Sequence, residues 1–198
     1  MPETAANRWQ QDDYRRSEKR FEGRQELIAK AARTCFARRG VTKTSIADIT
    51  RETDITRELF YYYFPNKGTA IDAVIDGYVD DARALLEQHL DEAAEAHPEG
   101  LASEDALATV IAALRHWMGT GADDPHPMVD QVVEIDQWPS VSHRAAGEAV
   151  AAMVSAGLIP ASAGEGLRIA LVGVMTVLRY NPEAEDEHLA SCIQPLLG

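Results

Sequence analysis

Residues 42–67 constrain the fold of this chain more than any other stretch. Their sequence, TKTSIADITRETDITRELFYYYFPNK, contains two short apolar periodicities separated by a break at Thr53-Asp54. Ser45 is placed to cap a first helix, and Thr56 is placed to cap a second. The spacing therefore predicts two short helices joined by a tight turn.

The second of these helices should bury Ile55, Phe60 and Phe64 and turn Arg57, Glu58, Leu59 and Tyr62 outward. Core packing does not account for the tyrosines at 61–63, because three successive side chains cannot all face inward on one helix. A short helix with a basic and an aromatic residue at its exposed start is typical of a helix-turn-helix, whose second helix enters the DNA major groove.

The segments TSIADI (44–49), DIT (54–56) and FYYYFPNK (60–67) resemble the TetR family of transcriptional regulators, and the resemblance covers roughly residues 24–70. Asp54 stands where the family usually has glycine in the turn, and aspartate tolerates the left-handed region better than most residues. Glu58-Leu59 replaces a pair of small residues, so the operator sequence cannot be transferred from a relative.

The resemblance implies an all-α fold, and no strand-like alternation in the sequence opposes it. We expect an N-terminal extension, flexible, at 1–20, a three-helix DNA-binding head at 21–67 and a helical effector-binding and dimerisation body at 68–198. The resemblance further implies that the chain is a ligand-responsive repressor that binds a palindromic operator as a homodimer. A non-catalytic helical adaptor is the alternative, but it would not need a basic head or a tyrosine run.

Phosphate contacts supply most of the affinity for DNA, and base contacts supply specificity. The hydroxyls of Thr44 and Ser45 at a helix start and the positive charge of Lys67 are suited to binding phosphate. Arg57 is the candidate reader of guanine, Leu59 and Tyr62 would meet thymine methyls or sugars, and Glu58 would accept from cytosine or repel wrong registers. The predicted DNA-binding residues are Thr44, Ser45, Thr56, Arg57, Glu58, Leu59, Tyr61, Tyr62 and Lys67.

The net charge of −13 hides a strong asymmetry along the chain. Residues 15–67 carry a balance of +6, whereas residues 68–198 carry −17. A basic head on an acidic body is typical of a DNA-binding module with a separate regulatory body. Chance clustering of basic residues is the competing interpretation. The basic run at 15–20 is open to two interpretations, an arm that reaches DNA or a solvated, mobile terminus.

Apolar residues recur at helical spacing at 24–39 and again from Lys67 to about residue 96, which predicts a floor helix for the head and a long helix after it. The long helix is either a lever between head and body or an ordinary core helix. Further helices are expected after Ser103, at 128–137, from Pro139 to Ala156, at 166–180 and at 183–197.

The segment at 166–180 is apolar on nearly every side, so it should be buried on every side. This predicts packing within the subunit on one face and against a second copy on another. The predicted dimer contacts are Leu167, Leu171, Val174, Leu178, Leu189 and Ile193.

Bulky or polar residues on inward faces of the body are candidates for an effector pocket, although ordinary core packing explains each of them as well. They are Tyr78, His89, His116, Trp117, Met128, Trp138, Met153 and Met175. A metal-dependent enzyme is a weaker alternative, because His116, His126 and His143 lie among carboxylates without a metal-binding motif. We expect no cofactor, no resident metal and no membrane partner. The polar first residues and the separated cysteines, Cys35 and Cys192, favour a cytoplasmic protein.

Overall fold

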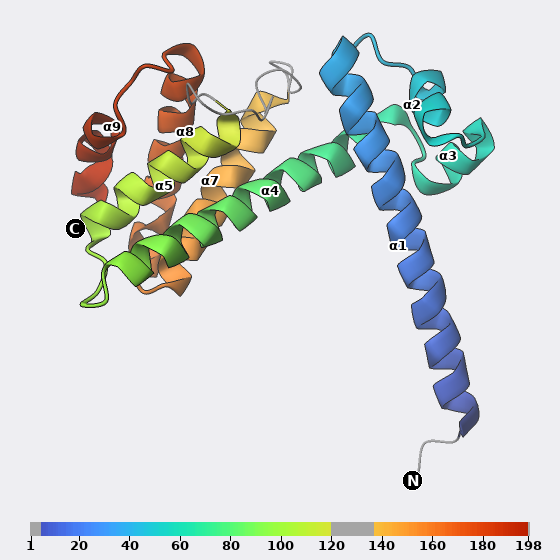
Figure 1. Ribbon diagram of the computed structural model, residues 1–198, viewed down its shortest axis with the longest axis horizontal. Helices are drawn as coiled ribbons and strands as arrows, with labels where there is room; N and C mark the ends of the chain where they lie inside the picture. The colour runs from blue at the N-terminus through green and yellow to red at the C-terminus, as the bar shows by residue number, and fades with distance from the viewer. Residues whose placement is uncertain (1–4, 120–136, 198) are drawn as a thin grey trace. The chain divides into compact units, whose positions relative to one another are not determined.

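The computed structural model describes residues 5–119 and 137–197, and the regular structure of this part of the chain is helical throughout, as the sequence predicts (Figure 1). Met128 and almost all of the helix expected at 128–137 lie outside the described residues. The elements are α1 (Ala5–Arg39), α2 (Ile46–Thr53), α3 (Arg57–Tyr63), α4 (Lys67–Ala96), α5 (Ser103–Met118), α7 (Trp138–Ser155), η1 (Ala161–Ala163), α8 (Gly164–Tyr180), α9 (Asp186–Ile193) and η2 (Gln194–Leu196).

The chain divides into two units, Met1–Val74 and Ile75–Gly198. The boundary falls inside α4, a continuous helix that carries residues of both units, and not at its first residue. The first unit therefore contains α1, α2, α3 and the start of α4. The second contains the rest of α4 and the helices that follow.

Helix α1 is longer than the apolar pattern indicates. The expected stripe is buried at Ile28, Ala32 and Phe36, and Gly40 ends the helix with φ 79. Leu27 is also apolar and lies within the predicted pattern at 24–39, but 46% of its surface is exposed. Residues 1–20 were expected to be a flexible extension, and residues 5–20 belong to α1, which begins at Ala5.

The second unit has its core between α4, α5, α7 and α8. Tyr78 and Leu86 of α4 are buried, as are Leu107 and Trp117 of α5. The indole Nε1 of Trp117 donates to the backbone carbonyl of Tyr78 at 2.9 Å, which satisfies the buried donor and joins the two helices.

Helices α7 and α8 pack closely because small residues face each other. Ala145, Ala146 and Ala149 of α7 are fully buried. A Cβ added to Gly164, at the start of α8, would lie 3.1 Å from Cγ1 of Val150. Glycine therefore permits the approach of the two helices at this point.

Ser103 is the first residue of α5, as expected, but it does not cap the helix. Its hydroxyl donates to the carbonyl of Leu158 at 2.8 Å. The polar signal at this helix start therefore marks a contact with the segment after α7.

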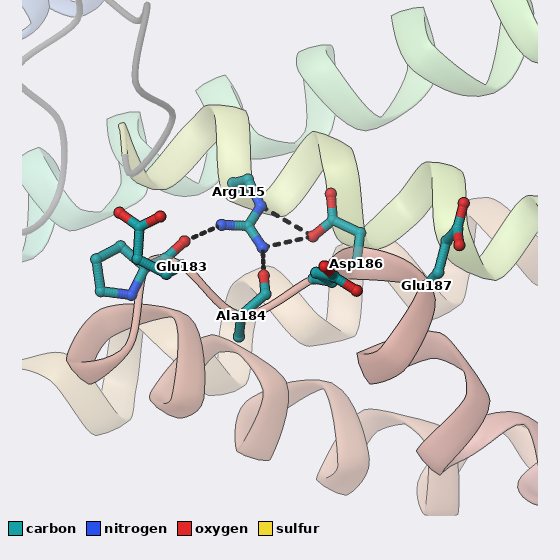
Figure 2. Close-up of a pocket in the computed structure, with 7 residues that line it drawn as sticks. Arg115, Glu183, Ala184, Asp186 and Glu187 are labelled. Atoms are coloured by element: carbon teal, nitrogen blue, oxygen red, sulfur yellow. Dashed lines mark hydrogen bonds and ion pairs between the residues drawn. The ribbon is translucent and has the colours of Figure 1, made fainter.

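Arg115 of α5 anchors the connection between α8 and α9 (Figure 2). Its Nε lies 2.9 Å from Oδ1 of Asp186, and its guanidinium also donates to the carbonyls of Pro182 and Ala184. A planar side chain with several donors suits this role, since one guanidinium can satisfy several acceptors at once. An open pocket of about 560 Å³ lies beside it, lined by Arg115 and residues 182–187.

One helical stretch, Ala161–Tyr180, has the length and mean hydropathy of a membrane span. A third of it is buried within the subunit, where α8 packs against α7 and α5. Core helices pass the same test of length and composition, so the stretch is weak support for a membrane location.

Candidate nucleic-acid interface

The α2–turn–α3 segment is built from two capped helices. At the start of α2, the backbone N–H of Asp48 donates to Oγ of Ser45 at 3.3 Å, and Ser45 returns its own N–H to the Asp48 carboxylate at 3.0 Å. At the start of α3, Thr56 Oγ1 accepts the N–H of Leu59 at 3.2 Å. Both caps expected from the sequence are therefore present, and they fix where each helix begins.

The turn between the helices depends on Asp54. Its φ of 51 and ψ of 45 place it in the left-handed region, as the departure from glycine predicted. The N–H of Ile55, the next residue, donates to the carbonyl of Thr50 at 3.0 Å and closes the end of α2. The turn therefore reverses the chain without a glycine.

Helix α3 buries one face and exposes the other. Phe60 and Phe64 are buried in the head, and Arg57, Glu58 and Leu59 are exposed at the start of the helix. Tyr61 is also exposed, and Tyr62 most of all, with 68% of its surface accessible. The side chains predicted to contact bases and phosphates on this helix thus share the exposed face.

The Glu58 carboxylate is held at the start of α3. Hydrogen bonds from its own backbone N–H and from the Thr56 side chain lower its pKa, and nearby Arg57 adds to the effect. Glu58 is therefore an exposed carboxylate next to Arg57 in the sequence, with its pKa lowered. An acceptor at this position suits the cytosine contact predicted for it.

The predicted phosphate contact of Thr44 is wrong. Thr44 is 2% exposed, and its hydroxyl donates to the carbonyls of Gly40 at 2.8 Å and Cys35 at 3.2 Å. The side chain stabilises the end of α1 and is not available to a ligand.

Ser45 is exposed, but its polar groups are engaged with Asp48. The Ser45 hydroxyl donates to Oδ2 of Asp48 at 2.7 Å, in addition to the two bonds of the cap. The start of α2 thus already holds an anion, so the free phosphate site expected there is not present in this structure.

Lys67 lies at the start of α4 and is half-buried. Its ammonium donates to the backbone carbonyl of Val41, in the connection between α1 and α2. An ammonium has three donors, so this bond orients Lys67 and leaves others for a phosphate.

Phe21 was missed at the sequence level. Its ring lies 4.7 Å from that of Tyr63 and 5.7 Å from that of Tyr62, centroid to centroid. Phe21 precedes Ile28 by two helical turns, so the same apolar stripe could have revealed it. This contact connects the middle of α1 to the exposed face of α3.

The cations of the head differ in their partners. Those near the end of α1 and on α2 are paired with carboxylates, whereas Arg57 makes no ion pair with any residue that the structure describes. The pairs are Lys30–Glu26 at 2.7 Å, Arg38–Glu52 at 3.0 Å, Arg39–Asp48 at 2.7 Å and Arg51–Asp48 at 3.3 Å.

The residues predicted to line an effector pocket are dispersed in the body. Tyr78 and Trp117 are joined by the hydrogen bond described above, and Met153 and Met175 are fully buried. Two pockets in the body, beside Arg115 and between α4 and α7, are lined by other residues.

Two further pairs involve the remaining candidates. Nε2 of His89 lies 3.3 Å from Nδ1 of His116, which joins α4 to α5. The Trp138 ring lies under Arg179, whose guanidinium carbon is 4.5 Å from the ring centroid. Within residues 5–119 and 137–197, no three His, Cys, Asp or Glu side chains are grouped as metal ligands.

The residues predicted to form the dimer interface are on the wrong face. All six are buried within the subunit itself, where they form the contacts of α8 and α9 with their own core. They are Leu167, Leu171, Val174, Leu178, Leu189 and Ile193. The exposed apolar residues of α8 are Ile169, Val177 and Tyr180, which the sequence analysis did not select.

Comparison with known proteins finds sequences that are similar to the head. Residues 28–74 match the sequence profile of the bacterial regulatory proteins of the tetR family. The chain is 31% identical over 85 residues to the transcriptional regulator TtgR of Pseudomonas putida, and the match spans 43% of this chain and 38% of TtgR. It is 33% identical over 57 residues to the regulator YuxN of Bacillus subtilis, across 29% of this chain and 20% of YuxN.

Solved structures extend the likeness of fold to most of the chain. A tetR-family regulator from Pectobacterium atrosepticum superposes with a TM-score of 0.56 at 19% identity, covering 90% of this chain and 92% of the other. RolR in complex with resorcinol superposes with a TM-score of 0.58 at 22% identity, covering 91% and 90%. The capped helices, the turn and the exposed face of α3 thus form a helix-turn-helix. Over residues 28–74 the chain is thus similar to the tetR family of bacterial regulatory proteins, and its matches span less than half the length of TtgR and of YuxN.

Proposed function

We propose that this protein is a cytoplasmic, ligand-responsive transcriptional repressor that binds a palindromic operator as a homodimer. In this proposal residues 21–67 bind DNA, and residues 68–198 bind the effector and the second subunit. The observation that carries the proposal is the exposed face of α3, where Arg57, Leu59 and Tyr62 project from a helix that buries Phe60 and Phe64 beneath them.

The role of each residue follows from its exposure and its bonds. Arg57 is exposed and lacks an ion-pair partner in the described chain, so its guanidinium can bind the edge of a guanine through two hydrogen bonds. Tyr61, in the second half of the recognition helix, and Lys67, at the start of α4, contact phosphates. Glu58 disfavours any register of the protein on DNA that places a hydrogen-bond acceptor of a base opposite its carboxylate.

A dimer is required because one short recognition helix reads only a few base pairs. The exposed face of α8 favours contact with a second subunit, because Ile169 and Tyr180 are 58% and 71% exposed. Gly166 and Gly173 on the same side of the helix allow a close approach of that subunit. A helix that buries one apolar face in its own core and exposes another fits an isologous contact.

The effector is a small molecule that binds within the helical body. RolR, whose fold resembles that of this chain, is bound to resorcinol in its solved structure. An effector that binds one conformation of the body better than another would shift the population and so change DNA affinity. A screen for small molecules that raise the melting temperature would identify it.

The proposal is tested by gel shift with the DNA upstream of the protein's own reading frame. Specific binding at low salt, followed by selected-site sequencing that returns a palindrome, is the expected result. Absence of binding to any duplex, with and without candidate metabolites, would overturn the proposal.

A further inference from the structure

Two neighbouring residues at the start of α7 carry buried polar atoms without hydrogen-bond partners. The indole Nε1 of Trp138, the first residue of the helix, is buried and has no partner among the residues that the structure describes. The amide Oε1 of Gln137, directly before it, is buried and lacks a partner there too. A buried donor and a buried acceptor are costly when they stay unbonded, so such atoms indicate a place where a bound molecule completes the bonding.

Trp117 shows what the indole of Trp138 lacks. Both rings are buried in the second unit, with Trp138 only 8% exposed. The N–H of Trp117 donates to the backbone carbonyl of Tyr78 at 2.9 Å. The indole at position 138 has no such acceptor within residues 5–119 and 137–197. The missing acceptor is therefore a local feature of the start of α7.

A cation lies over the Trp138 ring. The guanidinium carbon of Arg179, near the end of α8, is 4.5 Å from the ring centroid. Arg179 is half-buried, so its charge is screened less than it would be in water. The positive charge favours a ligand atom with partial negative charge next to the indole.

Apolar side chains flank this group on both helices. Val141 follows Trp138 by three residues on α7, and Met175 precedes Arg179 by four residues on α8, so each is a neighbour on its helix surface. Both are fully buried. Ser142 is buried as well, but its hydroxyl already donates to a backbone carbonyl at 3.2 Å. A ligand at this place would therefore be mostly apolar, with one polar group.

We propose that Gln137, Trp138 and Arg179 form the polar end of the effector site, and that the effector carries an acidic hydroxyl group, of the kind found in phenols, on a small apolar body. The hydroxyl oxygen accepts the N–H of Trp138, and the hydroxyl hydrogen is donated to Oε1 of Gln137. One hydroxyl thus satisfies both atoms, because it is a donor and an acceptor at once. The inference rests on the proposed function and names the chemical class of its effector.

Other polar groups fit this site less well. A carboxylate only accepts, so it would leave Oε1 of Gln137 without a donor. An ether oxygen has the same deficiency. An aliphatic alcohol can make both bonds, but its oxygen becomes less negative on hydrogen bonding than that of an acidic hydroxyl, and the guanidinium of Arg179 favours the more negative oxygen.

The test observes the indole N–H groups directly by NMR. The chain has three tryptophans, so full-length protein with 15N-labelled indole rings gives three indole signals, and Trp138→Phe assigns one of them. Addition of phenol should shift the Trp138 signal to a plateau as the new hydrogen bond forms. The Trp117 signal is the internal control, because its N–H is already bonded to Tyr78.

A second arm tests the need for a donor on the ligand. Phenol should bind at least about tenfold more tightly than anisole or benzoate, because neither of these can donate to Gln137. Gln137→Met removes the buried acceptor and should abolish the preference for phenol over anisole. The matched control is Gln88→Met, at an exposed glutamine of α4, which should keep the wild-type preference. Circular dichroism should show the same helix content for all variants.

The outcomes separate this inference from the proposed function, because the NMR arm uses no DNA. If phenol leaves the Trp138 signal in place, or if anisole binds wild type as tightly as phenol, this inference is wrong and ordered water satisfies the two atoms. Operator binding in the gel shift would still support the proposed function in that case. If phenol binds as expected but the protein binds no duplex, the hydroxyl site stands and the proposed regulatory function fails.

Discussion

Ser45 and Asp48 satisfy each other's polar groups at the start of α2. The Asp48 carboxylate accepts both the hydroxyl and the N–H of Ser45, and it also contacts Arg39 and Arg51. The bonds from Ser45 are the main reason that the pKa of Asp48 falls to about 2, with the two arginines adding to the effect. One carboxylate thus caps a helix and pairs with two of the head's cations.

We expect the Asp48 carboxyl to titrate near pH 2 in wild type and closer to 3.8, its ordinary value, in Ser45→Ala. Because folding lowers this pKa, the stabilisation is present above about pH 3.8 and is lost as the pH falls toward 2. Ser45→Ala should also cost about 1 kcal/mol at neutral pH through loss of the cap. Carboxyl NMR titration and urea unfolding measure the two effects. An unchanged Asp48 titration in the variant would contradict the assigned cause.

Asp54 offers a test of the turn. Asp54→Val should destabilise the head by about 1–2 kcal/mol, because a β-branched residue at φ 51 is strained. Asp54→Gly should leave the free energy of unfolding nearly unchanged. Glycine adopts the left-handed conformation without strain, and this gain offsets the greater conformational entropy that glycine gives to the unfolded chain. Denaturant unfolding of both variants checks this. Equal losses would show that the side chain and not the backbone conformation matters at this position.

Arg57 and Lys67 should separate specificity from affinity. Arg57→Ala should relax base preference at one operator position, with a loss of about 1–3 kcal/mol on the operator alone. Lys67→Ala should weaken binding to all duplexes and lower the salt slope by about one. Binding isotherms on operator and random DNA distinguish the two. If both variants lose the same affinity on both duplexes, the assigned roles are wrong.

The two faces of α8 should respond differently to charge. Ile169→Asp lies on the exposed face and should give a folded monomer by sizing chromatography. Leu171→Asp places a carboxylate at a fully buried position and should instead unfold the body. Persistence of a dimer in Ile169→Asp, with the melting temperature unchanged, would move the interface to another surface.

Local patterns in the sequence predicted the helices and the turn well, because capping and helical periodicity depend on near neighbours. Ser45, Thr56 and Asp54 all take the local roles expected of them. The burial of Phe60 and Phe64, and the exposure of Tyr62, followed from spacing on one helix.

The failures have a different origin. The hydroxyl of Thr44 is a group that can bind phosphate, so the sequence alone suggested that role. Only the turn at Gly40 brings this hydroxyl within hydrogen-bonding distance of the carbonyl of Cys35. Helix α8 is apolar on nearly all sides, so its pattern did not reveal that Leu171 faces inward and Ile169 outward. The first half of α1 has few apolar residues, so the sequence analysis missed the contact of Phe21, in the middle of the helix, with Tyr63 of α3.

Helix α4 is tied at two points along its length. Its first residue, Lys67, is bonded to the carbonyl of Val41, and the carbonyl of its Tyr78 is bonded to the indole of Trp117. A helix transmits axial displacement because its backbone hydrogen bonds make it stiff along its length. Any movement of α4 along its axis would therefore lengthen one of these two hydrogen bonds. The lengths of the two bonds would then report strain in the helix.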